Sequence, residues 1–116
     1  NGNVHTFEEA QACLEASGCD AVMSATGLLA MPALFSGPGR PEPADMAMEY
    51  LDFADRYNPP ATAVRAHLFG VLQPLLAHRP DLLSRLGRIY NKDADTTDPF
   101  RAFIEAARRE VPSMAE

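Results

Sequence analysis

The sequence predicts a chain in two parts, an α/β segment followed by a small all-α bundle. In residues 1–35, short apolar runs of strand length alternate with helical patterns, as in parallel α/β sheets and barrels. Proline and glycine are concentrated in residues 36–43, which is typical of a linker. Every periodic segment beyond that point has helical spacing. We therefore expect an α/β segment over residues 1–37, a linker over 38–43 and a helical bundle over 44–116.

The first helix has its own start and stop signals. Thr6 and Glu9 form the pattern of a capping box, in which the threonine hydroxyl accepts from the Glu9 N–H and the glutamate side chain reaches back. From there we expect a helix to about Ala16. Gly18 then ends it, because glycine tolerates the positive φ of a helix C-cap.

Two strand ends flank this helix. A glycine between two asparagines, at residues 1–3, is typical of the point where a strand gives way to a loop. Residues 21–24 are apolar and predict a short buried strand, and residues 28–35 predict a short helix after Gly27. One or two strands do not complete a sheet. We therefore expect most of the sheet to lie upstream, and the sequence to be the tail of a longer protein.

The bundle is expected to contain four helices. The first covers about residues 46–57 and places Met46, Tyr50, Phe53 and Tyr57 on one face, which we expect to be buried. An Asn-Pro-Pro sequence follows and ends this helix, because the residue before a proline is disfavoured in the helical conformation.

Prolines bound the other helices of the bundle. We expect residues 62–77 to form a helix that Pro74 kinks, because proline lacks an N–H and crowds the carbonyl four residues back. Pro80 opens a third helix, and Asp98 and Pro99 supply the N-cap and the first position of a fourth. The apolar residues expected in the core are Val64, Leu68, Phe69, Val71, Leu72, Leu75, Leu82, Leu83, Leu86, Ile89, Phe100, Phe103, Ile104, Ala107 and Val111.

Composition limits the classes of protein to consider. Apolar residues make up 47% and charged residues 22% of the 116 residues, as in a globular chain. No apolar run of ~18 residues is present, so no membrane span is predicted. Cys13 and Cys19 do not have the spacing of metal ligands. We expect them to be free thiols of an intracellular protein, and we expect no metal site.

The distribution of charge leaves two interpretations open. The formal net charge of −6, taken alone, argues against a nucleic-acid partner. Residues 56–92 nevertheless carry six Lys and Arg residues and one Asp, which gives this stretch a net charge of +5. These side chains either lie on solvated helix faces or form a basic strip that contacts phosphate.

The two predicted strand ends are candidates for a ligand site. Parallel α/β folds bind ligands at the carboxyl ends of their strands. Residues 24–27 are Ser-Ala-Thr-Gly and precede a short helix, so backbone N–H groups and the helix N-terminus can approach a phosphate there. An ordinary turn would have the same composition.

Three motifs, taken in order, resemble one enzyme family. Residues 1–3 (Asn-Gly-Asn), 20–27 (Asp-Ala-Val-Met-Ser-Ala-Thr-Gly) and 32–35 (Pro-Ala-Leu-Phe) resemble the end of the barrel in tRNA-dihydrouridine synthases. Residues 49–52 and 64–69 look like the helical domain of the same family. The small residues in the second motif and the sequence of the third resemble the eukaryotic-type branch, which acts on the D-loop of tRNA.

The resemblance implies a (β/α)8 barrel with FMN at its top, followed by a helical bundle that helps to bind tRNA. Residues 1–37 would be the last βα units of that barrel. Reduced flavin would deliver hydride to a uridine C5=C6 bond, a cysteine would donate the proton, and NADPH or NADH would re-reduce the flavin. The family's cysteine lies upstream of this sequence. Neither Cys13 nor Cys19 is therefore assigned a catalytic role.

Motif positions imply which residues contact the cofactor. Asn1, Gly2 and Asn3 match the flavin-contacting loop, and Ala25 and Thr26 match the pair that contacts the phosphate. Bacterial members often carry arginine at the second position of that pair. Phosphate binding here would depend on backbone N–H groups and the helix end, and Asn1 has the alternative role of capping a turn.

The resemblance also implies an RNA contact on the bundle. Arg65 and His67 match an Arg-x-His motif whose basic residues face RNA. Each has a structural alternative: Arg65 would pair with a carboxylate such as Asp52 or Asp55, and His67 would hydrogen-bond within the bundle. Arg79 is expected at the carboxyl end of a helix, where positive charge is favourable.

The sequence leaves more than one function open. The first is an FMN-dependent tRNA-dihydrouridine synthase, in which this part alone is inactive. The second is a non-catalytic helical remnant that binds RNA or protein as a subunit of a larger assembly. A different flavin- or phosphate-binding barrel is disfavoured by the Arg-x-His motif and by the separate bundle.

Overall fold

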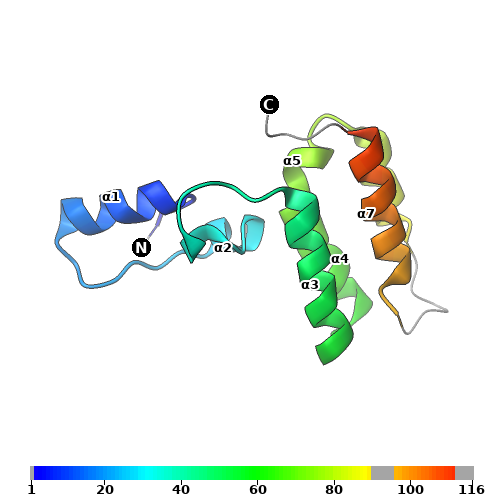
Figure 1. Cartoon of the computed structure of the whole chain (residues 1–116), viewed down its shortest axis with the longest axis horizontal. Coiled ribbons are helices and arrows are strands. Elements are labelled where there is room, and N and C mark those ends of the chain that lie inside the picture. Colours follow the sequence, from blue (N-terminus) through cyan, green and yellow to red (C-terminus); the bar gives the residue numbers. More distant parts are fainter. Residues whose placement is uncertain (1, 90–95, 112–116) are drawn as a thin grey trace.

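The computed structural model describes residues 2–89 and 96–111. In this part of the chain, the regular structure consists of α-helices and one 3₁₀ helix (Figure 1). An amino-terminal segment and a helical bundle lie side by side and are joined by an extended linker. The elements are α1 (Phe7–Ser17), α2 (Thr26–Ala30), η1 (Leu34–Ser36), α3 (Pro43–Tyr57), α4 (Ala61–Val71), α5 (Gln73–Leu76), α6 (Pro80–Gly87) and α7 (Asp98–Glu110).

The predicted capping box at the start of α1 is present in a shifted form. The Glu9 N–H donates to the Thr6 hydroxyl at 3.1 Å, as predicted. The Glu9 carboxylate accepts from the N–H of His5 at 2.7 Å, one residue before the N-cap. Gly18 ends the helix with a φ of 67°, which confirms the predicted C-cap.

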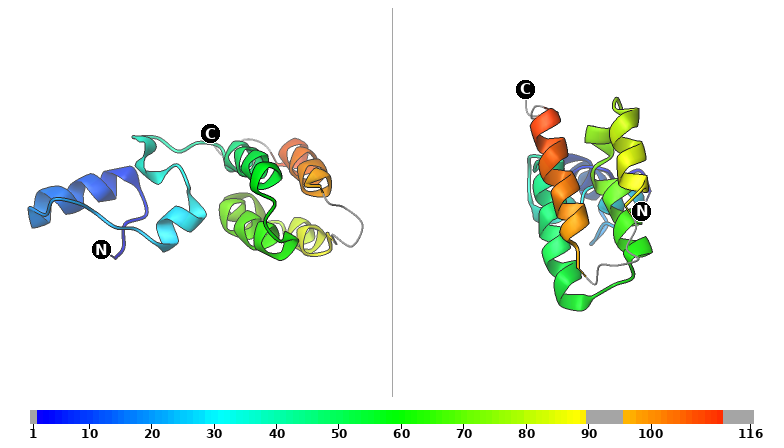
Figure 2. Two further views of the ribbon diagram at one scale, coloured as in Figure 1. Left: turned by 90° about the horizontal axis from the view of Figure 1, so that it is seen from below. Right: turned by 90° about the vertical axis from the view of Figure 1, so that its right-hand side faces the viewer.

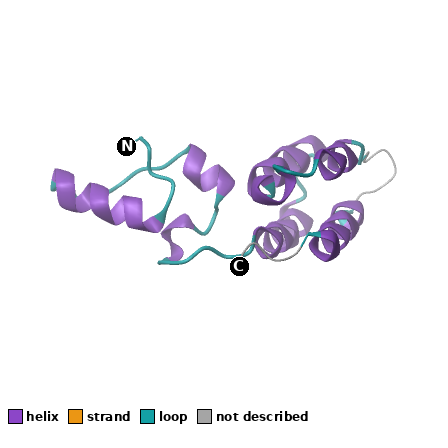
Figure 3. Cartoon of the chain, turned by 90° about the horizontal axis from the view of Figure 1, so that it is seen from above, coloured by secondary structure: helices purple, strands orange, loops and turns teal. Residues whose placement is uncertain are grey.

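The strand predicted over residues 21–24 is not formed. This stretch runs between α1 and α2 without a ladder, and no strand occurs among the residues that the structure describes (Figure 3). A strand requires a neighbour for its backbone hydrogen bonds. Val22 is nevertheless partly buried, whereas Met23 is 59% exposed. The helical part of the predicted fold class is therefore observed, and the barrel part is not.

The short helix predicted over residues 28–35 is divided into two. The first part is α2, and the second is η1, which follows a turn at Pro32. A proline at this position has no N–H to continue the helical hydrogen bonds, which explains the break. Met31 and Leu34 are buried in the packing of this segment, with Val4 and Ala10.

The linker ends at α3, whose buried face differs from the predicted one. Phe53 and Tyr57 are 51% and 70% exposed, so their assignment to the core is wrong. Apolar residues occupy more than one stripe of this helix, and the sequence pattern favours the aromatic stripe, which is not the one that faces the core. The face that packs against the bundle consists mainly of small residues, which allow the neighbouring helices to approach closely, and includes Ala44, Ala47, Leu51 and Ala54.

The remaining helices follow the predicted proline pattern. The helix expected to bend at Pro74 is divided into α4 and α5, with the break at Leu72, and Pro80 begins α6. The fourth helix begins at Asp98 with Thr97 as its N-cap, one residue earlier than predicted. Among the predicted core residues, Leu83 is 46% exposed and Phe69 only partly buried.

The bundle consists of α3, α4, α6 and α7, with α5 continuing α4 after its break (Figure 2). Helix α3 packs against α4 and α7, and α6 packs against the same two helices. The amino-terminal segment reaches the bundle through α2, which packs on α4. Gly70 permits this approach, because a Cβ there would lie 3.3 Å from the Leu29 carbonyl oxygen. In the described ranges, no helix has the length and apolar character to cross a membrane.

Candidate functional site

The structure brings the two predicted ligand-binding loops together. The Ser24 hydroxyl donates to the Val4 carbonyl oxygen at 2.7 Å. A Cβ on Gly27 would collide with that same carbonyl oxygen and would lie 2.8 Å from the Ser24 Oγ. Only glycine therefore allows the turn after residue 24 to pack so closely on the segment that follows Asn3.

The cofactor-contacting residues that the sequence predicts lie on exposed backbone at this junction. Gly2 and Asn3 are exposed and have φ values of 91° and 59°. Ala25 and Thr26 are exposed at the start of α2, whose first N–H groups have no acceptor within the helix. Asn1 lies outside the described residues. The prediction that these positions bind FMN stays a prediction.

A basic residue that the sequence analysis missed lies beside these loops. Arg40, from the linker, lines a hollow of about 410 Å³ together with Gly27, His5 and Glu8. The sequence gives one indirect indication of this residue. The Ala25-Thr26 pair lacks an arginine, so another residue would have to supply the positive charge for a phosphate. Arg40 is remote from that pair in the sequence, so only the path of the linker reveals their proximity.

The guanidinium group of Arg65 forms a hydrogen bond within the bundle. Its Nη2 donates to the Ile89 carbonyl oxygen at 2.8 Å, just beyond the end of α6. Its Nε is buried without a hydrogen-bond partner. The proposed pairing of Arg65 with Asp52 or Asp55 is wrong, because Arg101 binds both carboxylates at 2.9 and 2.7 Å.

The carboxylates that we expected near Arg65 instead join α3 to α7. The Thr97 hydroxyl donates to Asp55 at 2.7 Å and accepts from Nε of Arg101 at 3.1 Å. The hydrogen bonds from Thr97 and then Arg101 lower the pKa of the Asp55 carboxyl. This cluster is a structural connection between α3 and α7, and its hydrogen bonds favour the charged form of Asp55.

His67 lies on the exposed side of α4 beside an aromatic ring of α3. The centroids of the His67 and Tyr50 rings are 5.4 Å apart, with the ring planes inclined by 55°. The expected hydrogen bond of His67 within the bundle is not among the contacts of the described residues, and the ring contact replaces it. Burial raises the pKa of the Tyr50 hydroxyl.

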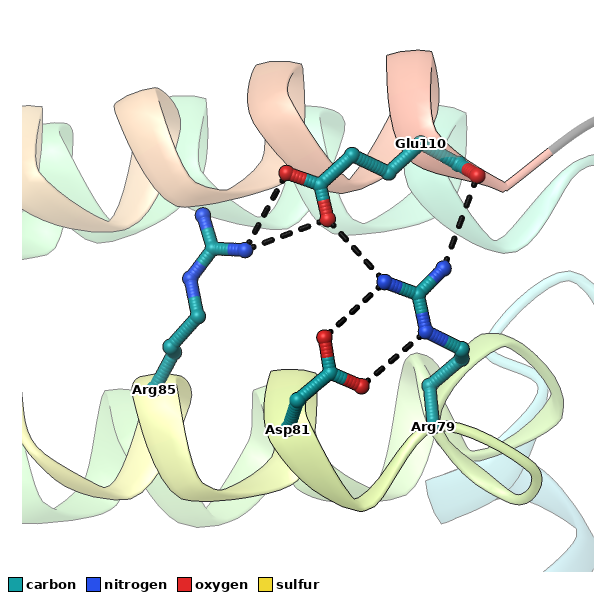
Figure 4. Close-up of polar contacts among 4 residues, drawn as sticks. All are labelled: Arg79, Asp81, Arg85 and Glu110. Atoms are coloured by element: carbon teal, nitrogen blue, oxygen red, sulfur yellow. Dashed lines mark hydrogen bonds and ion pairs between the residues drawn. The ribbon is translucent and has the colours of Figure 1, made fainter.

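In addition to the hydrogen bond of Arg65, two members of the basic stretch form ion pairs within the bundle (Figure 4). Arg79 binds Asp81 at 2.9 Å and Glu110 at 3.1 Å, and Arg85 binds Glu110 at 3.1 Å. Arg79 is the N-cap residue of α6, and its Nη1 donates to the Glu110 carbonyl oxygen at 3.5 Å, at the carboxyl end of α7. Its expected place at the carboxyl end of a helix is therefore confirmed, on α7. These pairs connect α6 with α7, and they reduce the positive charge that the stretch offers to a phosphate.

The two cysteines are free, as predicted. Cys13 is partly buried on α1, and Cys19 is exposed beyond its end. The Ser17 hydroxyl lies 2.8 Å from the Cys19 Sγ, and this hydrogen bond is the main cause that lowers the pKa of the thiol. No group of three or more potential metal ligands gathers in the part of the chain that the structure covers.

Comparisons with known proteins agree with the motifs. The family model for dihydrouridine synthase matches residues 1–108. The chain belongs to the dihydrouridine synthase family. No solved structure matches the chain.

Curated relatives carry names that agree with this family. A mouse tRNA-dihydrouridine(16/17) synthase-like protein is 36% identical over 77% of this chain and 18% of its own length. The tRNA-dihydrouridine(16/17) synthase of Saccharomyces cerevisiae is 32% identical over 79% of this chain and 24% of its own. That of Schizosaccharomyces pombe is 28% identical over 100% of this chain and 32% of its own. The chain thus spans a third or less of these relatives, and the names of all three include NAD(P)(+).

Proposed function

We propose that this chain is the carboxy-terminal part of an FMN-dependent tRNA-dihydrouridine synthase, which reduces a uridine C5=C6 bond in tRNA. The observation that carries the proposal is the match of the dihydrouridine synthase model over residues 1–108, which include both candidate loops and the bundle. NADPH or NADH would be the reductant. The activity belongs to the whole protein, and this chain alone is expected to be inactive.

The junction of the two loops supports the assignment of the cofactor site. Asn1, Gly2 and Asn3 would contact the flavin, and Ala25 and Thr26 would hold its phosphate through backbone N–H groups. The Ser24–Val4 hydrogen bond and the close packing at Gly27 make the two loops one surface, as a shared cofactor requires. When bound, FMN would supply the hydride for the reduction.

Arg40 is our candidate for the charge that the phosphate pair lacks. It lies on the wall of the hollow next to Gly27, close in space to the start of α2. A guanidinium there would neutralise phosphate charge that backbone N–H groups alone would leave uncompensated. Glu8 lines the same hollow and would orient the arginine.

Arg65 and His67 remain our candidates for RNA contact on the bundle. His67 presents an exposed ring beside Tyr50, which supports a role for this side chain at the surface. Arg65 would have a double role, because the bond of its Nη2 to the Ile89 carbonyl fixes the guanidinium while its Nη1 group would contact the RNA. The free thiols of Cys13 and Cys19 support an intracellular protein.

A non-catalytic binding subunit is the second candidate function. It is favoured by the pairing of Arg79 and Arg85 with Glu110, which leaves the bundle with less positive charge for tRNA than its sequence suggests. In this case the chain would bind RNA or protein without taking part in a reduction.

A chimeric enzyme distinguishes the two candidates. The matching region of the Saccharomyces cerevisiae relative would be replaced by this chain, and the chimera expressed in a yeast strain without the native enzyme. We expect the purified chimera to show the visible absorbance of bound FMN and to restore dihydrouridine in tRNA. The isolated 116-residue chain should show no stoichiometric flavin spectrum. A folded chimera without flavin or dihydrouridine would favour the binding subunit.

A further inference from the structure

The aromatic face of α3 that points away from the bundle core borders a hollow of about 320 Å³. Tyr50 and Phe53 line it from α3, and Pro32 and Ser36 line it from the turns around η1. Phe53 is 51% exposed although its side chain is fully apolar. An exposed ring beside a hollow indicates a binding surface more than a solvated helix face.

One carboxylate in the wall of this hollow limits which ligands fit it. Glu49 lies on the same wall as Tyr50 and Phe53, and it is exposed. It makes no ion pair or hydrogen bond with the residues that the structure describes. A phosphate would be repelled by this charge, so the hollow does not fit the backbone of a nucleic acid. A ligand with N–H donors on the edge of a flat ring fits both the carboxylate and the aromatic wall.

The Tyr50 ring, which lines this hollow, has neighbours that restrict its movement. The His67 ring contacts the Tyr50 ring, with the ring centroids 5.4 Å apart. Met46, which is buried, underlies the same stripe of α3 one turn before Tyr50. A fixed aromatic ring loses little conformational entropy when a base stacks on it.

We propose that this hollow binds one unpaired guanine base of the RNA substrate. The proposal rests on the function proposed above, and it assigns to Glu49 the recognition of the base edge. The Watson–Crick edge of guanine presents two neighbouring N–H donors, N1–H and N2–H, which a carboxylate accepts in a bidentate pair. The guanine ring stacks on Tyr50 and contacts Phe53. Unpaired bases in loops are the parts of an RNA that proteins recognise by such stacking and edge contacts.

Another part of the same protein is the competing occupant of this surface. Covering the hollow with protein would bury the Glu49 carboxylate, which requires an additional partner because an unpaired buried charge is strongly unfavourable. A guanine base supplies that partner with its own donors. The carboxylate therefore favours the base over an apolar protein segment.

Binding of matched RNA hairpins to the full 116-residue chain tests the proposal. The hairpins share one stem and a uridine loop that contains a single guanosine, inosine or adenosine, and fluorescence anisotropy gives each affinity. The wild-type chain should prefer guanosine to adenosine by about tenfold, as a bidentate contact to a base requires. Inosine lacks the N2 amine and should fall between them.

Two variants separate base recognition from general charge effects. Glu49→Gln should remove most of the preference for guanosine. Glu15→Gln makes the same change of charge at an exposed position on α1, and it should keep the preference. Phe53→Leu should weaken the binding of all three hairpins about equally. Melting temperatures of the variants would check that each chain is folded.

The proposal is overturned if Glu49→Gln keeps the preference for guanosine, or if Glu49→Gln and Glu15→Gln change the affinity for every hairpin to the same extent. It is also overturned if the wild-type chain binds all hairpins equally or none of them. These results leave the proposed function standing if the chimeric enzyme forms dihydrouridine. A chimera that forms none while the hairpin preference is observed would contradict the proposed function and keep the base-binding hollow.

Discussion

At the scale of single residues, the candidate site is determined by contacts with backbone carbonyl groups. No sequence pattern predicts such contacts. Gly27 lies against the Val4 carbonyl, and Arg65 donates to the Ile89 carbonyl. The sequence predicts a helix after Gly27, and the family resemblance implies an RNA contact at Arg65. Their actual partners are carbonyl groups 23 and 24 positions away, and a carbonyl has no signature in the sequence.

Replacement of Gly27 by alanine should separate the two loops. The added Cβ would meet the Val4 carbonyl oxygen and the Ser24 Oγ, so the backbone must shift, at a cost of about 1–3 kcal/mol. We expect Gly27→Ala to lower the flavin content of the chimeric enzyme, as measured by visible absorbance.

The matched control for Gly27→Ala is Gly87→Ala on α6. Its Cβ would lie 3.8 Å from the Phe69 ring, an ordinary contact, so flavin content and stability should not fall. Equal flavin content in Gly27→Ala and wild type would show that the two loops do not act together.

Replacement of Arg65 by alanine should affect both stability and RNA binding. The Ile89 carbonyl loses its donor, so the melting temperature should fall. If the remaining N–H groups contact phosphate, tRNA affinity should fall and the salt dependence of binding should decrease by about one unit. Filter binding of tRNA at several salt concentrations measures both effects in the chimeric enzyme, where FMN content should stay constant. A lower melting temperature with unchanged affinity and salt dependence would leave Arg65 a purely structural role.

At the scale of elements, ion pairs between helices account for much of the charge of the chain. Arg101 joins α7 to α3, and Arg79 and Arg85 join α6 to α7 (Figure 4). The helices themselves were predictable from Pro74, Pro80 and the apolar periodicity. The pairing of the charges was not, because it depends on which helix faces meet in the folded bundle.

The Arg79–Asp81 pair should make stability depend on acid pH. The Arg79 guanidinium lowers the pKa of Asp81 from 3.8 to about 2, so the charged carboxylate stabilises the folded state above about pH 4. This contribution should be lost as the pH falls from about 4 towards 2. Urea denaturation should therefore show wild type more stable than Arg79→Ala near neutral pH, with the difference shrinking at about pH 2.

Arg88→Ala is the matched control for this titration. Arg88 is an exposed arginine at the end of the same helix, and it has no ion pair with the described residues. Its replacement should leave the stability profile close to that of wild type. A constant difference between wild type and Arg79→Ala over the whole pH range would contradict the assigned role of Asp81.

At the scale of the whole molecule, the two parts of the chain differ in how completely they bury their apolar side chains. The bundle buries large side chains from each of its four main helices, such as Leu51, Leu68, Leu86 and Phe100. The amino-terminal segment leaves Met23, 59% exposed, and Leu29, 57% exposed, without cover. Sequence periodicity predicted the bundle because its contacts are mostly between neighbouring helices. It predicted a strand over residues 21–24 that needs neighbours, and the described residues provide none.

The sequence also did not predict which face of α3 is buried. A sequence pattern finds an apolar stripe, but it does not tell which of two stripes meets the rest of the bundle. The alanines of α3 pack inward because they allow close approach, and this leaves Phe53 and Tyr57 on the outer face. The candidate guanine-binding hollow therefore lies where the sequence predicted core.

The bundle should fold without the amino-terminal segment. Its four helices each carry a start signal and contribute to one core, and α2 contacts it mainly at α4. A chain of residues 41–116 should show helical far-UV circular dichroism and a cooperative thermal transition. A largely disordered chain with a non-cooperative melt would show that the bundle depends on the segment before it.

Formation of dihydrouridine by the chimeric enzyme is the most direct test of the proposed function. The chimera that carries this chain in the Saccharomyces cerevisiae relative would be incubated with unmodified tRNA and NADPH, and the tRNA analysed by mass spectrometry of its nucleosides. If the proposed function holds, this chimera converts uridine to dihydrouridine and a chimera lacking this chain converts none. A folded, flavin-containing chimera that leaves every uridine unreduced would contradict it.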